Sequence, residues 1–105
     1  MKLYLDDNRF SPPGYKLVRT VDDLKRFVGK FQEKIETIDI DYDMGNYSKF
    51  GGNGEDFIKW LEEMVLTKEI KLKKNIELKC HSSNVEAKRR IEETIEIIKA
   101  FLRNS

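Results

Sequence analysis

Cysteine and histidine are nearly absent from this 105-residue chain, which contains one of each, Cys80 and His81. A lone cysteine cannot form an internal disulfide, and one cysteine with one histidine excludes a dedicated zinc site. Long apolar runs are also missing, since no segment approaches the roughly 20 apolar residues of a membrane-spanning helix. The chain starts Met-Lys-Leu-Tyr-Leu-Asp-Asp, which is too short and too soon acidic for a signal peptide. We therefore expect no membrane association and a cytoplasmic location.

Net charge is small, although charged residues are abundant. They make up 37% of the chain, yet the formal net charge is +1. This balance predicts no strong nucleic-acid-binding patch, and the alternation of lysine and glutamate is typical of solvated helix faces. An apolar content of 39%, with 10% aromatic residues, is enough for a packed core and argues against disorder. The length predicts a single domain over residues 1–105 and indicates nothing about the oligomeric state.

Alternating strand and helix patterns predict a small α/β fold. Apolar runs bounded by turn residues predict four strands, at residues 2–6, 15–19, 37–41 and 76–80. Apolar side chains at helical spacing predict three helices, at residues 21–32, 54–66 and 84–102. We expect Thr20 to cap the first helix and a capping box of Ser83 and Glu86 to open the last. Strand–helix alternation implies a parallel sheet with right-handed crossovers.

Two acidic pairs follow two of the predicted strands: Asp6 with Asp7, and Asp41 with Asp43. The carboxyl ends of parallel strands form one edge of a sheet, where ligands bind, so we expect these carboxylates and His81 to line one crevice. A single aspartate at a strand end is usually a turn former or a helix cap. A cluster of them repels itself unless protons or a cation neutralise it. We therefore expect Mg²⁺ (or Mn²⁺), held by Asp6, Asp7 and Asp41.

Three neighbouring features each allow a functional and a structural interpretation. His81 could act as a general acid or base beside the carboxylates, or could be a hydrogen-bonded structural histidine. Ser82, Ser83 and Asn84 open the last helix, whose free N–H groups could bind phosphate, and an ordinary cap by Ser83 is compatible with this role. Arg9 could bind a substrate phosphate or pair with a neighbouring carboxylate.

The loop from Met44 to Asn53 gives only a weak phosphate signal, because its glycines lack the Lys-Ser/Thr ending of a P-loop. A flexible lid over the crevice, or a turn with Asn53 as the next helix cap, fits the sequence better. Tyr47 and Phe50 in this loop could stack on a base. Asp39 alternates in phase with the second acidic pair and could point toward the site.

Several segments, in order along most of the chain, carry a resemblance to a known family. They are Leu-Asp-Asp-Asn-Arg at 5–9 with Pro12-Pro13, Val18-Arg19-Thr20, Ile-Asp-Tyr-Asp-Met-Gly at 40–45, Asp-Phe-Ile-Lys-Trp-Leu at 56–61, and His-Ser-Ser-Asn at 81–84. This ordered set resembles the cyclic-phosphate-processing receiver-like domains, a compact relative of response-regulator receivers. One departure is Tyr42, which stands where that family usually has histidine.

The resemblance implies a small flavodoxin-like, three-layer fold whose four-stranded parallel sheet has the order 2-1-3-4 and whose first helix is reduced to a loop. It also implies a site in which Asp41, Asp43 and His81 are catalytic. Arg9 and the segment Ser82, Ser83 and Asn84 would bind phosphate or substrate. A signalling receiver also needs a fifth strand ending in lysine, for which this chain has no place, so phosphorelay output is not expected.

Together these features predict a metal-dependent phosphoesterase that processes a cyclic or terminal phosphate of a nucleotide or an RNA end. One alternative is a non-catalytic module that sequesters a phosphorylated nucleotide in the same crevice, where His81 would only form hydrogen bonds. A second alternative is a phosphoacceptor receiver with Asp41 as its acceptor, against which the missing lysine argues.

Overall fold

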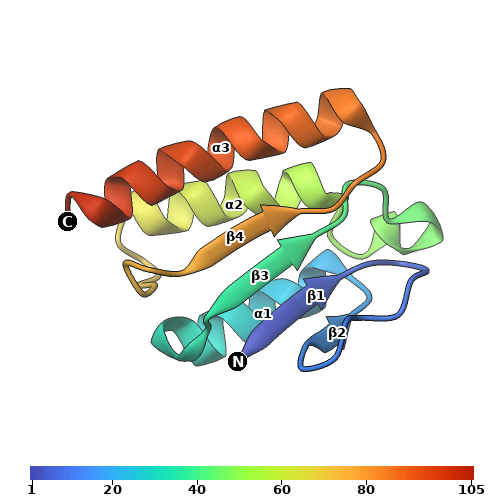
Figure 1. The fold of residues 1–105 in the computed structure, drawn as a ribbon, viewed down its shortest axis with the longest axis horizontal. Helices are drawn as coiled ribbons and strands as arrows, with labels where there is room; N and C mark the ends of the chain where they lie inside the picture. The colour runs from blue at the N-terminus through green and yellow to red at the C-terminus, as the bar shows by residue number, and fades with distance from the viewer.

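The computed structural model describes residues 1–105 and contains a four-stranded parallel sheet with three α-helices (Figure 1). The strands are β1 (Lys2–Leu5), β2 (Lys16–Val18), β3 (Thr37–Ile40) and β4 (Glu77–Cys80). The α-helices are α1 (Val21–Phe31), α2 (Gly54–Leu66) and α3 (Val85–Arg103), with short 3-10 helices η1 (Gln32–Lys34) and η2 (Gly45–Lys49). The strand order β2-β1-β3-β4 confirms the predicted receiver-like α/β topology.

All three helices cover one face of the sheet, so the fold has two layers and the prediction of three layers is wrong. The strand residues in the core share one side of the pleat, and they are Leu3, Leu5, Val18, Ile38, Ile40, Leu78 and Cys80. Right-handed crossovers put α1 and α2 on the same face, because the steps from β2 to β3 and from β3 to β4 run in the same direction. The step from β1 to β2 runs the other way, and its loop, residues 6–15, contains no helix. A third layer would need that helix.

Side chains alone cover the second face of the sheet. Tyr4 on β1 is only 7% exposed, because Tyr15 from the β1–β2 loop packs edge-on against it, with ring centroids 5.9 Å apart. The ammonium groups of Lys2 and Lys79 lie 5.6 and 5.9 Å from the Tyr15 ring centroid. Asp39 pairs with Tyr4 in the β1–β3 register and therefore also faces this side. The face that carries no helix therefore presents Tyr4 and Asp39 next to the carboxyl ends of β1 and β3.

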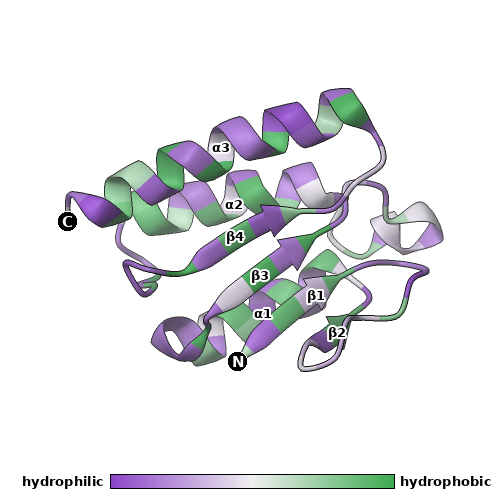
Figure 2. Cartoon of the chain, in the orientation of Figure 1, coloured by the Kyte–Doolittle hydropathy of each residue, from purple (hydrophilic) through white to green (hydrophobic).

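Apolar residues recur along each helix (Figure 2), and those at the predicted spacing pack in or against the buried core. Thr20 caps α1 by accepting a hydrogen bond from the Asp23 N–H, as predicted. Asn53 caps α2, which also agrees with one of the two interpretations of its loop. The predicted Ser83 cap is wrong: Asn84 is the N-cap of α3 and accepts from the Ala87 N–H at 3.0 Å. The Ser82 hydroxyl accepts from the Asn84 N–H, so the helix begins one residue later.

Gly54 allows α2 to pack against the chain that leaves β3. A Cβ at this position would overlap the Asp41 carbonyl oxygen and lie 2.9 Å from its carbon. We expect Gly54→Ala to lower the free energy of unfolding by about 2–4 kcal/mol, since the clash is with backbone. Gly29→Ala is the matched control, because Gly29 lies exposed in α1 and a Cβ added there would have nothing within 4 Å. It should gain roughly 0.5–1 kcal/mol in urea unfolding, and equal effects of the two substitutions would contradict this packing.

Candidate functional site

The three polar residues that follow β1, β3 and β4 have backbones fixed by the sheet. The N–H groups of Asp6, Asp41 and His81 donate to Val18, Leu5 and Ile40 carbonyls at 3.2, 3.0 and 3.0 Å. Each residue therefore extends the ladder of hydrogen bonds by one position beyond its strand. Because rigid strands carry these residues, their side chains converge with little freedom.

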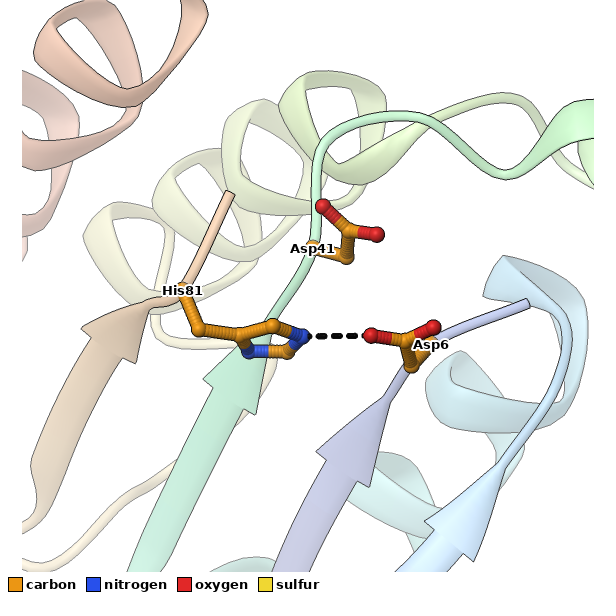
Figure 3. A group of neighbouring side chains, drawn as sticks. All are labelled: Asp6, Asp41 and His81. Atoms are coloured by element: carbon orange, nitrogen blue, oxygen red, sulfur yellow. Dashed lines mark hydrogen bonds and ion pairs between the residues drawn. The ribbon is translucent and has the colours of Figure 1, made fainter. Parts of the chain in front are cut away.

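His81 lies between the carboxylates of Asp39 on β3 and Asp6, which follows β1. Figure 3 shows its contact with Asp6, with Asp41 nearby. Its Nε2 is 2.8 Å from Asp6 Oδ2 and its Nδ1 is 2.7 Å from Asp39 Oδ1. The ring also stacks on Tyr4, with centroids 4.3 Å apart and planes 6° from parallel. An ionised carboxylate can only accept hydrogen bonds, so this geometry suits an imidazolium that donates from both nitrogens.

The pKa values of this cluster shift in the directions that its contacts dictate. Burial opposes the charged form of His81, but hydrogen bonds to Asp39 and Asp6 outweigh it and raise the pKa of the imidazole. Burial likewise opposes ionisation of Asp6, but N–H groups of Arg9 and Asn8, together with His81, lower the pKa of this carboxyl. The two shifts agree and describe one ion pair.

Asp41 differs from Asp6, because the pKa of its carboxyl is raised. Burial, aided by the negative charge of Asp6, raises the pKa of Asp41 against the opposing hydrogen bond from the Tyr42 N–H. That bond, at 2.8 Å, uses Oδ1 only. The ligand atoms of Asp6, Asp41 and His81 all lie within 4.8 Å of one another, which is close enough to share one metal ion.

These residues lie at a crevice of about 570 Å³ at the carboxyl edge of the sheet. It is lined by Asp6, Asp7, Asn8, Arg9, Asp41, Asp43, Asn46, Tyr47, Ser82, Ser83 and Asn84. The structure thus brings eight of the nine predicted site residues to one concave surface. His81 is the exception, since it contacts Asp6 without lining the crevice.

Asp7 and Asp43 occupy the crevice but stand apart from the group formed by Asp6, Asp41 and His81. The Asp43 carboxylate is exposed and accepts a hydrogen bond from the Gly45 N–H at 2.8 Å, which shapes its own turn. Asp7 approaches the same turn, because a Cβ on Gly45 would lie 2.7 Å from Asp7 Oδ2. Gly45 has φ +53°, a conformation that favours glycine.

Two arginines serve the loop after β1 in different ways. The N–H of Arg9 donates to Asp6 Oδ1 at 2.8 Å, while its guanidinium lies 3.6 Å from Asp6 Oδ2 and remains half exposed. Arg9 therefore pairs with Asp6 and still reaches solvent in the crevice. Arg19 donates from Nη1 to the carbonyls of Asp6 and Arg9, at 3.0 and 2.9 Å, and so fixes the shape of this loop.

The segment from Met44 to Asn53 forms hydrogen bonds to residues at the starts of both neighbouring helices. It contains η2, and Met44 at its start is fully buried. The Met44 N–H donates to Asn53 Oδ1 at 3.1 Å, and the Phe50 carbonyl accepts from the Asp22 N–H at 3.0 Å. The segment is thus tied to α2 at one end and to α1 at the other.

A family comparison decides where this arrangement belongs. The family model of the cyclic-phosphate processing receiver domain matches residues 1–97 of the chain. The chain belongs to this family. No curated protein and no solved structure gave a significant match.

Within the cyclic-phosphate processing receiver domains, this chain has a sheet that ends at β4 and is followed only by α3. Separately, none of the helices has both the length and the apolar character needed to cross a membrane.

The structure gives Asp39 and Arg19 contacts at the site that the sequence does not predict. The sequence indicates only that Asp39 could point toward the site, yet it holds one of the two His81 nitrogens. Arg19 stands out in the sequence only as part of a family segment, yet it binds two carbonyls of the acidic loop. The alternation of Asp39 with Asp41 is the sequence signal that could have indicated the role of Asp39. No local pattern indicates the role of Arg19.

Proposed function

We propose that this receiver domain is a metal-dependent phosphoesterase that processes a cyclic or terminal phosphate of a nucleotide or an RNA end. The observation that carries the proposal is the convergence of Asp6 and Asp41, which are 1% and 8% exposed, beside His81 at one crevice. Four carboxylates line that crevice against the single guanidinium of Arg9. Such an excess of negative charge needs a cation before it can accept a phosphate.

The donor set suits Mg²⁺ or Mn²⁺. Asp6 and Asp41 would hold the ion, with Asp7 from the crevice wall, because these ions prefer carboxylate oxygens. Asp41 Oδ2 accepts no hydrogen bond within the chain, so it is free to serve as a ligand. When bound, the ion would polarise a phosphoryl oxygen or activate water.

The protein groups around the crevice have separate tasks in this proposal. The half-exposed guanidinium of Arg9 binds phosphoryl oxygens. Ser82 and Ser83, with the first N–H groups of α3 beyond the Asn84 cap, stabilise negative charge on the phosphoryl group. Asp43, exposed at the crevice, orients water.

His81 and Asp39 form the proton-handling pair. Asp39 holds Nδ1, which fixes the ring and favours the imidazolium. The Nε2–H, which donates to Asp6 here, becomes available to the leaving oxygen only when that hydrogen bond opens. Asp39 is therefore a positioning residue and His81 is the proton donor.

Binding without turnover is the second candidate, and the geometry of His81 is what favours it. Both ring nitrogens are occupied by carboxylates, so no proton is offered to the crevice in this conformation. A protein that kept this arrangement would bind a phosphorylated nucleotide and release it unchanged.

One assay separates the two candidates. The purified protein is incubated with Mg²⁺ or Mn²⁺ and a panel of 2′,3′-cyclic nucleotides, cyclic dinucleotides and ADP-ribose cyclic phosphate. Turnover that is lost in Asp41→Asn and in His81→Ala supports the enzyme. Tight binding without product supports sequestration, and the absence of both across the panel would refute the phosphate site.

A further inference from the structure

The crevice is polar and has a single apolar residue, Tyr47, among those that line it. The chain exposes seven large apolar side chains, and four of them lie on segments that leave the carboxyl edge of the sheet. These four are Phe10, Tyr47, Phe50 and Val85. Only Tyr47 of these four lines the crevice.

Tyr47 differs from the other aromatic residues in having a free ring that faces the crevice. Phe50 has the Lys49 ammonium 5.3 Å from its ring centroid, and the remaining aromatic rings, Phe10 excepted, pack on the core or pair with another ring. Phe10 is 88% exposed but does not line the crevice. Tyr47, 40% exposed, is the one apolar residue among the eleven that line it.

The backbone beneath Tyr47 is already in place. Its N–H donates to the Met44 carbonyl at 2.9 Å, and its carbonyl accepts from the Phe50 N–H at 2.9 Å. Met44 is completely buried and anchors the start of η2. A ring presented by a fixed backbone loses little conformational entropy when it binds a flat partner.

We propose that Tyr47 stacks on the base of the substrate, so that the domain acts on nucleoside phosphates in preference to base-free sugar phosphates. The inference rests on the phosphate site proposed above, because the acidic residues and Arg9 line the same crevice as the Tyr47 ring. Stacking accepts any base, since every base has a π-face. The structure therefore assigns to Tyr47 a selection for the presence of a base, with little discrimination among the four.

The test compares kcat/KM for nucleoside 2′,3′-cyclic phosphates with kcat/KM for ribose 2,3-cyclic phosphate, which has no base. In the wild type we expect the nucleoside substrates to be preferred. Tyr47→Ala should reduce that preference about tenfold or more, mainly through KM, as expected for the loss of one stacked base. Tyr47→Phe keeps the ring and should keep the preference, and Phe10→Ala should also leave the preference unchanged. If the protein binds without turnover, the same ratio is measured with dissociation constants.

The outcomes distinguish this inference from the proposed function. An unchanged preference in Tyr47→Ala, with wild-type turnover or binding intact, overturns the stacking and leaves the phosphate site standing. A loss in Tyr47→Phe equal to that in Tyr47→Ala also overturns it, because the ring would not be the cause. Circular dichroism first establishes that the wild type is folded. If the folded wild type neither binds nor converts any substrate, both the stacking and the proposed function are overturned.

Discussion

Asp41→Asn is expected to abolish turnover and, in the absence of divalent cations, to make the protein more stable. The raised pKa of Asp41, caused by burial and the nearby Asp6 charge, means that its ionised form is disfavoured in the folded state. At pH 7 that charge therefore costs stability, and an amide of the same shape removes the cost. We expect a gain of roughly 0.5–2 kcal/mol and a loss of turnover of about 10²–10³-fold or more.

Thermal unfolding with and without Mg²⁺ measures the stability part of this prediction. The wild type should gain stability on addition of Mg²⁺ by mass action, by about 2.7 kcal/mol at a hundredfold excess over the dissociation constant. Asp41→Asn should start from a higher Tm and gain little. Asp22→Asn removes an exposed first-turn aspartate of α1 outside the crevice and should behave as the wild type. A lower Tm for Asp41→Asn than for the wild type would show that Asp41 stabilises the fold and is not held for function.

His81→Gln should lose both activity and stability, and the loss of stability should depend on pH. The substitution removes the imidazolium that pairs with Asp6, which is 1% exposed, and leaves only the half-exposed Arg9 guanidinium at 3.6 Å. Removing one member of a buried pair costs about 3–5 kcal/mol. The partly exposed ring places the expected loss at the lower end of that range. Turnover should fall because the variant has no titratable proton donor.

The pH window follows from the two pKa directions. The pKa of His81 is raised, so its contribution is complete below the unfolded value and is lost as pH rises through the folded one. The pKa of Asp6 is lowered, so its contribution is complete above the unfolded value and is lost as pH falls through the folded one. The difference in unfolding free energy between the wild type and His81→Gln should therefore be largest between about pH 4 and 6.5. Urea titrations across pH measure it, and a pH-independent difference would contradict the ion pair.

The sheet and the meeting of the strand ends could be predicted because both follow from chain order. Apolar runs set the strands, and parallel pairing sends Asp6, Asp41 and His81 to one edge whatever the details of packing. The number of layers was predicted wrongly, although the rule needed was available. A right-handed crossover fixes the face that each helix covers, and the single step in the opposite direction, from β1 to β2, has only a loop.

Contacts that depend on side-chain direction could not be predicted in the same way. Asp39 lies on the face of the sheet that carries no helix. It contacts His81 because the His81 ring stacks on Tyr4, which lies on the same face. Ser83 has the sequence pattern of a helix cap because Glu86 follows at the right spacing. The Asn84 N–H instead donates to Ser82, and Asn84 is the N-cap of a helix that begins at Val85. In the first case a hydrogen bond between residues of neighbouring strand ends decided the outcome, and in the second a hydrogen bond within the turn before α3 did.

The most direct test of the proposed site is the binding of Mn²⁺, measured by the electron paramagnetic resonance signal of the free ion. The proposal predicts one bound ion per chain in the wild type and in Asp22→Asn, and affinity at least about tenfold weaker in Asp41→Asn and Asp6→Asn. Equal binding by all four folded proteins, or no binding by the wild type, would contradict a cation held between the ends of β1 and β3.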